Sequence, residues 1–257
     1  MSQRSAPTPW VEVAGQHAHR PWPLPSRPWV LRMQWHDLLF AHWPVPVGVL
    51  RERVPACFSI DTFDGEAWLG VVPFRMTHVG PRGLPFLPGA SAFLELNVRT
   101  YVTVADKPGV YFLSLDAASA LAVAVARRWF RLPYFNAEMT LSTENATRCY
   151  RSHRTHHGAP AADFAGTYAP SGPAFTATPG TLEHWLTERY CLYTVDARGR
   201  PRRGEIHHRA WPLQPAEGAI EVNTMAASHG VALPACAPLL HFAERLVVVA
   251  WPLAPAV

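Results

Sequence analysis

The sequence predicts one α+β domain in which antiparallel strands dominate and helices are few and short. Segments with strand patterns outnumber helical segments roughly three to one. The 257 residues include 26 prolines and 10 tryptophans, and 16% are charged, which favours a loop-rich β protein with thick apolar packing. No internal repeat or linker divides the chain. We therefore expect a proline-rich arm over residues 1–28, disordered or draped, and then a single β-rich domain over residues 29–257.

The first part of the domain combines strands with a short helix. Residues 30–40 predict a strand, and residues 45–54 predict a short helix. The pair Asp64-Gly65 lies between two apolar segments and is the strongest hairpin signal in the chain. Residues 76–93 are rich in glycine and proline, which predicts a long loop that is either a functional lid or a structural wrap.

The most informative stretch lies near the middle of the chain. Its first strand, 94–104, alternates apolar and polar side chains, so its two faces differ in chemistry. A turn at 106–109 leads to an apolar strand, 110–115, and then to an Ala-rich helix, 116–132, with Asp116 as its N-cap. The strand's apolar face comprises Leu94, Leu96, Val98, Val102 and Val104, and its polar face Glu95, Asn97, Arg99, Tyr101 and Thr103. The helix is expected to pack through Leu121, Val125, Trp129 and Leu132.

The later segments continue the antiparallel pattern. Residues 137–143 and 146–155 predict a strand pair, and residues 164–168 predict a further strand. Thr181 is a suitable N-cap for a short helix. The apolar run at 245–251 predicts a buried strand near the end of the chain.

Composition excludes several kinds of partner. The net charge of +4 comes almost wholly from scattered arginines without interleaved aromatics, so we expect no nucleic-acid partner. The four cysteines form no C-x-x-C pair, which is typical of reduced thiols in the cytoplasm. The proline- and arginine-rich beginning is unlike a signal peptide, and the longest apolar tract, 246–257, is too short to span a bilayer. We expect a cytoplasmic protein with no membrane partner, and a homo-oligomer stays possible.

Several segments spread along the chain resemble one protein family. They read VPFRM from Val72, ELNVRTYV from Glu95, GVYFLSLDA from Gly109, AR-x-x-F-x-LPY from Ala126 and LTERYCLY from Leu186. The joint pattern resembles the YqjF-like family of bacterial proteins of undefined function, over roughly residues 30–252. That family is grouped by fold with acetoacetate decarboxylase. The resemblance therefore implies a β-barrel-like domain with an internal pocket.

The same resemblance indicates where this chain departs from the decarboxylase. That enzyme uses a lysine of lowered pKa, which forms a Schiff base with its keto acid substrate. The decarboxylase lysines follow an F-P motif after the helix, whereas here Leu132-Pro133 is followed by Tyr134 and Phe135. Lys107 is the only lysine, and it lies in a predicted turn where its amine stays protonated and hydrated. We therefore expect no Schiff-base chemistry, and no cofactor.

The polar face of strand 94–104 supplies the main candidate site. The corresponding strand of the decarboxylase carries a pocket glutamate, so the resemblance implies that Glu95 lies inside the barrel, with Arg99 or Arg128 nearby. A solvated sheet face and a purely structural Glu–Arg pair are the alternatives. We expect a catalytic role for Glu95 and Tyr134, and ligand binding by Arg99, Arg128, Asn97 and His42.

Arg128 and Tyr134 also have alternative roles, and His42 is included on the resemblance alone. Arg128 also suits the negative end of a helix, and a buried Tyr134 could equally donate to a backbone carbonyl. His42 is included because the resemblance implies a functional side chain in this early region, where the decarboxylase has an arginine.

The histidines predict no metal site. The run H-x-x-H-H at 153–157 lacks the helical spacing and the glutamate of a zincin motif, and no two cysteines stand at ligand spacing. Two hypotheses on function remain. The first is a small-molecule binding protein whose ligand is a carboxylate or carbonyl compound. The alternative is an enzyme of the same fold without the Schiff-base lysine, in which Glu95 acts as acid or base.

Overall fold

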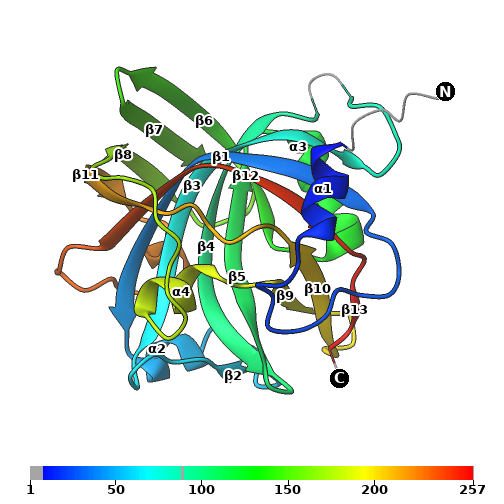
Figure 1. Ribbon diagram of the computed structural model, residues 1–257. Helices are drawn as coiled ribbons and strands as arrows, with labels where there is room; N and C mark the ends of the chain where they lie inside the picture. Colours follow the sequence, from blue (N-terminus) through cyan, green and yellow to red (C-terminus); the bar gives the residue numbers. More distant parts are fainter. Residues whose placement is uncertain (1–7, 88–89, 257) are drawn as a thin grey trace.

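The computed structural model describes residues 8–87 and 90–256, which form a sheet-dominated structure with short helices (Figure 1). The strands are β1 (Leu31–Val45), β2 (Ser59–Ile60), β3 (Ala67–Pro81), β4 (Phe93–Val104), β5 (Lys107–Ala117), β6 (Tyr134–Glu144), β7 (Thr147–Arg154), β8 (Asp163–Pro170), β9 (Cys191–Val195), β10 (Pro201–His207), β11 (Gln214–Asn223), β12 (Leu239–Ala250) and β13 (Ala254–Pro255). The helices are α1 (Pro9–Gly15), α2 (Val47–Arg51), α3 (Ala120–Val125) and α4 (Leu182–Thr187), with a π-helical turn η1 (Ala126–Phe130) and a 3-10 turn η2 (Ala227–His229). The predicted α+β class with mainly antiparallel pairing is confirmed.

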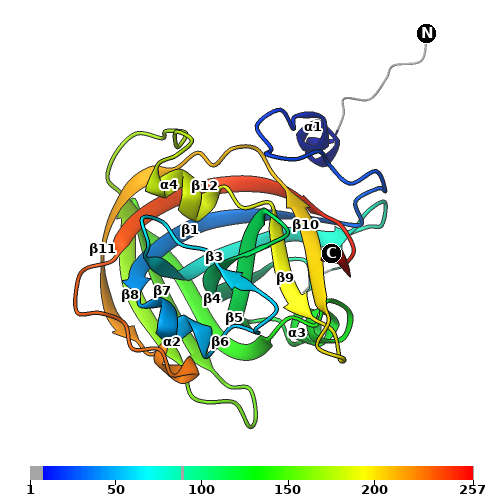
Figure 2. The same cartoon turned by 90° about the horizontal axis from the view of Figure 1, so that it is seen from below.

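The strands close into two rings that share part of their circumference. The larger ring runs β5–β6–β7–β8–β11–β12–β1–β3–β4 and returns to β5, while the smaller ring runs β5–β9–β10–β12–β1–β3–β4. Two long strands divide between the rings. β5 pairs with β9 at Val110 and Tyr111 but with β6 from Leu115 onward, and β12 likewise pairs with β11 near one end and β10 near the other. Figure 2 shows β4 and β5 between β7–β8 on one side and β9–β10 on the other.

The shared strands have two buried faces, each turned toward one ring. Leu96 and Val98 of β4 join the apolar core of the larger ring, which also contains Tyr150 and Phe164. The opposite face of β4 carries the polar side chains and turns toward the smaller ring. A strand that is buried on both faces explains why its polar residues are buried too.

Two hairpin turns organise this part of the sheet. The turn at Asp64-Gly65 is as predicted, with φ of 50° and 83°. The turn between β4 and β5 is Ala105-Asp106, with φ of 48° and 59°, rather than the predicted 106–109. Two central residues with positive φ match the twist of the flanking strands. The strands therefore pair up to Val104 and Lys107, and Ala105 and Asp106 alone form the turn.

The helix after β5 begins later than predicted. Ser119 is its N-cap and accepts a hydrogen bond from the backbone N–H of Ala122 at 3.3 Å. Asp116 does not cap the helix. It lies in β5, fully buried, where Arg154 donates two hydrogen bonds of 2.7 Å to its carboxylate.

The packing face of this helix also differs from the expectation. Val125 and Leu132 do face the interior, but Leu121 is 54% exposed and Trp129 is 70% exposed. The cause is η1, because a π-helical turn takes more residues than an α-helical one and rotates the later side chains. Phe130 takes the inward position that was expected of Trp129.

The described part of the arm, residues 8–28, contacts the smaller ring. In α1, Trp10 and Val13 are buried, and Trp10 belongs to an apolar cluster with Trp251. Arg20 is buried and pairs with Glu205 of β10 at 2.7 Å. The described residues exclude 1–7, 88–89 and 257. The first of these ranges belongs to the predicted arm and the second to the predicted loop. The division of the chain at residue 28 stays a prediction.

A helix long and apolar enough to cross a membrane is not found in the part of the chain that the structure describes.

Candidate functional site

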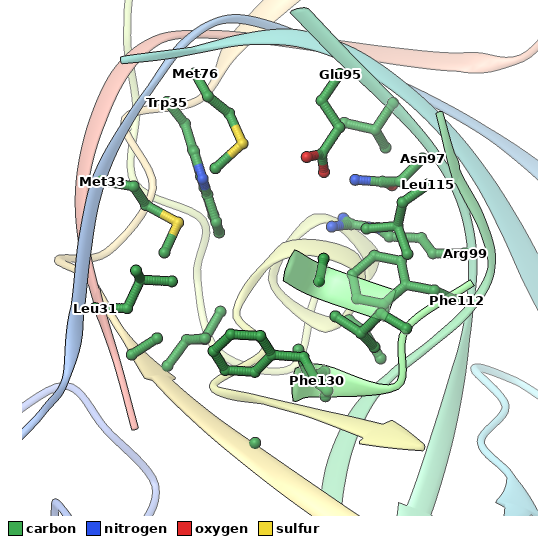
Figure 3. A pocket seen from close by; sticks show the side chains of 18 of the residues that line it. Leu31, Met33, Trp35, Met76, Glu95, Asn97, Arg99, Phe112, Leu115 and Phe130 are labelled. Carbon is green, nitrogen blue, oxygen red and sulfur yellow. The ribbon is translucent and has the colours of Figure 1, made fainter. Parts of the chain in front are cut away.

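A cavity of about 220 Å³ lies inside the smaller ring. Its walls come from β1, β3, β4, β5, β9 and β10, and the α3–η1 segment covers one end with Ala122, Val125 and Phe130. Most of the lining side chains are apolar. Figure 3 shows Glu95, Asn97 and Arg99 on one wall and Met33 and Trp35 on the wall opposite. The few polar side chains of the cavity are therefore surrounded by apolar ones.

Glu95 is a buried carboxyl group without a cationic partner. Only 3% of the residue is exposed, and no ion pair includes it among the described residues. The Tyr134 hydroxyl donates a hydrogen bond of 2.9 Å to Glu95 Oε2. Burial raises the pKa of Glu95 to about 8; the Tyr134 bond opposes this rise, and the charge of Asp116 adds to it. Glu95 is therefore protonated at neutral pH, and it can donate a hydrogen bond as well as accept one.

Arg99 is a permanent cation on the same wall. No carboxylate lies within 4.0 Å of its guanidinium among the described residues, and its Nε is buried without a hydrogen-bond partner. Its recorded polar contact is a long hydrogen bond of 3.4 Å from Nη2 to the Leu186 carbonyl. Asn97, between Glu95 and Arg99, is 5% exposed, and its Oδ1 is also buried without a partner. The strand alternation predicted this shared face.

Further polar groups reach the cavity from elements that the sequence did not mark as part of the site. Trp35 of β1 and Trp211, which follows β10, both line the cavity, and the Nε1 of each is buried without a partner. Arg189, directly after α4, lines it too and has a buried, unpartnered Nη2. Arg189 lies within the LTERYCLY segment, so the resemblance was a signal that could have identified it. No sequence pattern identifies the two tryptophans.

Two of the expected binding residues lie elsewhere. His42 is fully buried but does not line the cavity; its Nε2 and the Tyr101 hydroxyl are 2.7 Å apart. Burial and the charge of Arg99 hold the pKa of His42 well below its ordinary value, so the ring is neutral. Arg128 is exposed on η1 and does not line the cavity, because the π-helical turn directs it to solvent. These positions correct the expectation that His42 and Arg128 border the pocket.

The remaining predicted features concern metals and the lysine. No group of three or more His, Cys, Asp or Glu side chains suitable for a metal ion occurs among residues 8–87 and 90–256. Lys107 begins β5 and does not line the cavity; its Nζ lies 5.6 Å from the centroid of the Trp22 ring.

Comparison with known proteins gives a family and a fold. The model of the DUF2071 family, described as an uncharacterized conserved protein, matches residues 32–247. The uncharacterized protein YqjF of Bacillus subtilis (strain 168) is 47% identical over 230 residues, which cover 90% of this chain and 94% of that protein.

Solved structures of low sequence identity share the fold. Acetoacetate decarboxylase from Legionella pneumophila superposes with a TM-score of 0.60 at 12% identity, and the match covers 99% of each chain. The enduracididine biosynthesis enzyme MppR in complex with pyruvate gives a TM-score of 0.60 at 10% identity, over 90% of this chain and 91% of that one. The expected relation to the acetoacetate decarboxylase fold is thus confirmed.

Proposed function

The chain belongs to the DUF2071 family of uncharacterized conserved proteins, and we propose that this member binds a small organic acid or carbonyl compound with an apolar body. The observation that carries the proposal is Arg99, a partly buried cation without a carboxylate partner in a mostly apolar cavity, with its Nε buried and unpartnered. A buried charge without a partner is unfavourable, and a bound carboxylate would neutralise it.

The balance of hydrogen-bonding groups supports the same ligand class. The buried donors without a hydrogen-bond partner on residues of the cavity wall are Trp35 Nε1, Trp211 Nε1, Arg99 Nε and Arg189 Nη2. Against them stands one unpartnered acceptor, Asn97 Oδ1. A ligand that satisfies this wall must accept more hydrogen bonds than it donates, as carboxylates and carbonyls do.

The protonation state of Glu95 is compatible with an anion. An ionised Glu95 would repel a carboxylate in the same cavity, but with a pKa of about 8 the group is neutral at pH 7. The cavity of about 220 Å³ lies below the range of about 300–1,000 Å³ that is usual for drug-sized ligands, so the compound is small. MppR, which has the same fold, was crystallised with pyruvate, a small oxo acid.

The test is isothermal titration calorimetry with matched ligands and matched variants. Hexanoate should bind to the wild-type protein more tightly than hexanol, which has the same chain without the charge. Arg99→Met should weaken hexanoate binding about 10- to 100-fold, the effect of losing a charge-assisted hydrogen bond of about 1.5–3 kcal/mol. Arg128→Met, which removes an exposed guanidinium from η1, is the control and should leave binding unchanged. Tighter binding of hexanol, or an unaffected Arg99→Met, contradicts the proposal.

A specific observation also favours the enzymatic alternative. The pKa of Glu95, raised to about 8, is close to the working pH, as acid–base catalysis requires, and its oxygen is held by Tyr134 at 2.9 Å. Such a group could move a proton next to a ligand carbonyl. Incubation with 2-oxohexanoate in D₂O would then introduce deuterium at the carbon beside the carbonyl, which NMR can measure. Glu95→Gln would abolish this exchange. Wild-type exchange no faster than that of buffer alone rules out this activity for that substrate.

A further inference from the structure

A second arginine, Arg189, lines the cavity and lies beside Tyr101. The side chain of Arg189 is 4% exposed. Its Nη1 donates to Asp61 Oδ2 at 2.6 Å, and its Nε donates to the Trp185 carbonyl at 2.6 Å. Its Nη2 is buried, has no partner and belongs to a residue of the cavity wall. One edge of this guanidinium is therefore fixed by the protein, and Nη2 on the other has no hydrogen-bond partner in the protein.

Arg189 and Arg99 lie at the same end of the cavity. Both guanidinium groups lie near the ring of Tyr101, with the Cζ of Arg189 4.8 Å and that of Arg99 5.7 Å from its centroid. The hydroxyl of this ring lies 2.7 Å from Nε2 of His42. Two guanidinium groups with unpartnered nitrogen atoms, one from β4 and one from the segment after α4, thus lie near the same ring.

We propose that Arg99 and Arg189 form a two-guanidinium seat for a single carboxylate, which orients the ligand with its charged end toward Tyr101. This inference rests on the proposed function of the cavity. Guanidinium groups bind carboxylates through paired N–H donors, so one carboxylate can satisfy the free nitrogen atoms of both arginines. The apolar body of the ligand then extends along the wall of Met33 and Met76, across the open space from Arg99 (Figure 3).

The charges around the seat select a monoanion. Arg99 and Arg189 contribute two positive charges, and Asp61 contributes one negative charge through its ion pair with Arg189. The neighbouring His42 is neutral. The remaining charge of plus one is neutralised by one carboxylate. A phosphate monoester carries a charge of about −1.5 to −2 at pH 7, so it would leave an excess of negative charge in a buried site, which is unfavourable. Asp61 is therefore the residue that sets ligand charge specificity.

The experiment compares hexanoate with butyl phosphate, which has a similar size but more charge, by calorimetry at neutral pH. Wild-type protein should prefer hexanoate. Asp61→Asn keeps a hydrogen-bond acceptor for Arg189 but removes the negative charge, and it should shift the ratio of the two dissociation constants at least about tenfold toward butyl phosphate. The double variant Arg189→Gln/Asp61→Asn removes both members of this ion pair together, and it should weaken hexanoate binding about tenfold or more.

The outcomes separate the two proposals. If hexanoate fails to bind to the wild type, the proposed function fails. If hexanoate binding depends on Arg99 but is unchanged in the double variant, or if Asp61→Asn does not alter the ratio, the seat is wrong and the proposed function stands. A crystal structure of the wild type with hexanoate decides the case should the variants not fold. A carboxylate that accepts from both guanidinium groups supports the seat, and a carboxylate that contacts Glu95 and Trp35 instead overturns it.

Discussion

Replacing Glu95 by glutamine should stabilise the protein, and the gain should increase with pH. The folded protein holds the Glu95 proton up to a pKa of about 8, whereas the ordinary value of a glutamate is 4.5. Between these values the folded state binds more protons than the unfolded state, so raising the pH favours unfolding. The stability that protonated Glu95 permits is complete below pH 4.5 and is lost as the pH rises toward 8.

The magnitude follows from the difference between the two pKa values. At about 1.4 kcal/mol per pH unit, the wild type is destabilised by about 3 kcal/mol at pH 7, by about 4 kcal/mol at pH 8 and by about 5 kcal/mol at pH 9 and above. Glutamine has no such penalty, and its side-chain oxygen can still accept the hydrogen bond that Tyr134 donates. The predicted gain in the free energy of unfolding has this size, falls to about 1 kcal/mol near pH 5 and vanishes below about pH 4.

Urea unfolding of wild type and Glu95→Gln, measured at steps from about pH 5 to about pH 9, checks the prediction. Glu217→Gln, an exposed site on β11 outside the recorded ion pairs, is the control for the substitution itself. A stability difference that stays flat with pH would refute the reasoning. So would a wild type that gains stability over the variant as the pH rises, since Glu95 would then be ionised and paired in the folded state.

Three further predictions concern buried charge, close packing and the lysine. Arg154→Met should lower the free energy of unfolding by about 3–5 kcal/mol, because it leaves Asp116 buried and unpaired. In urea unfolding, the double variant with Asp116→Leu should recover much of this loss. An equal loss in both variants would contradict the prediction. Gly109→Ala should destabilise by about 1–3 kcal/mol, because a β-carbon there would lie 2.6 Å from an aromatic carbon of β9, whereas Gly48→Ala, with nothing within 4 Å in α2, should be neutral or stabilising in a thermal melt. Incubation with acetoacetate and borohydride should give no covalent adduct in an intact-mass measurement, because Lys107 lies outside the cavity; an adduct lost in Lys107→Ala would overturn this.

Local patterns in the sequence were sufficient for much of the fold. The alternation in β4 placed Glu95, Asn97 and Arg99 on one face, because successive side chains in a strand point to opposite sides whatever surrounds them. The turn at Asp64-Gly65 was also predictable from local sequence, because this residue pair favours the positive φ that both positions adopt. The strand count indicated the α+β class, and the resemblance to a known family supplied the barrel-like closure with an internal pocket, which no local pattern contains.

Errors arose where a local pattern was ambiguous. An Ala-rich segment has no strong packing face, so the contacts of α3 and η1 with the sheet decided that Phe130 turns inward and Trp129 outward. Asp116 is a plausible N-cap in isolation, but Arg154, 38 positions later in the chain, holds it within β5. Neither the orientation of Phe130 and Trp129 nor the position of Asp116 in β5 is determined by the residues next to them in the chain.

The sequence by itself thus determined which side chains share a strand face, and that the only lysine lies outside the motif that a Schiff base requires. Only the tertiary structure decided that this face meets a cavity, that Arg189 lines the same cavity as Arg99, and that Glu95 keeps its proton near neutral pH. The physical reason is that a pKa and an unpaired charge depend on desolvation by every wall around them. Those walls come from strands that are distant in the chain and meet when the smaller ring closes.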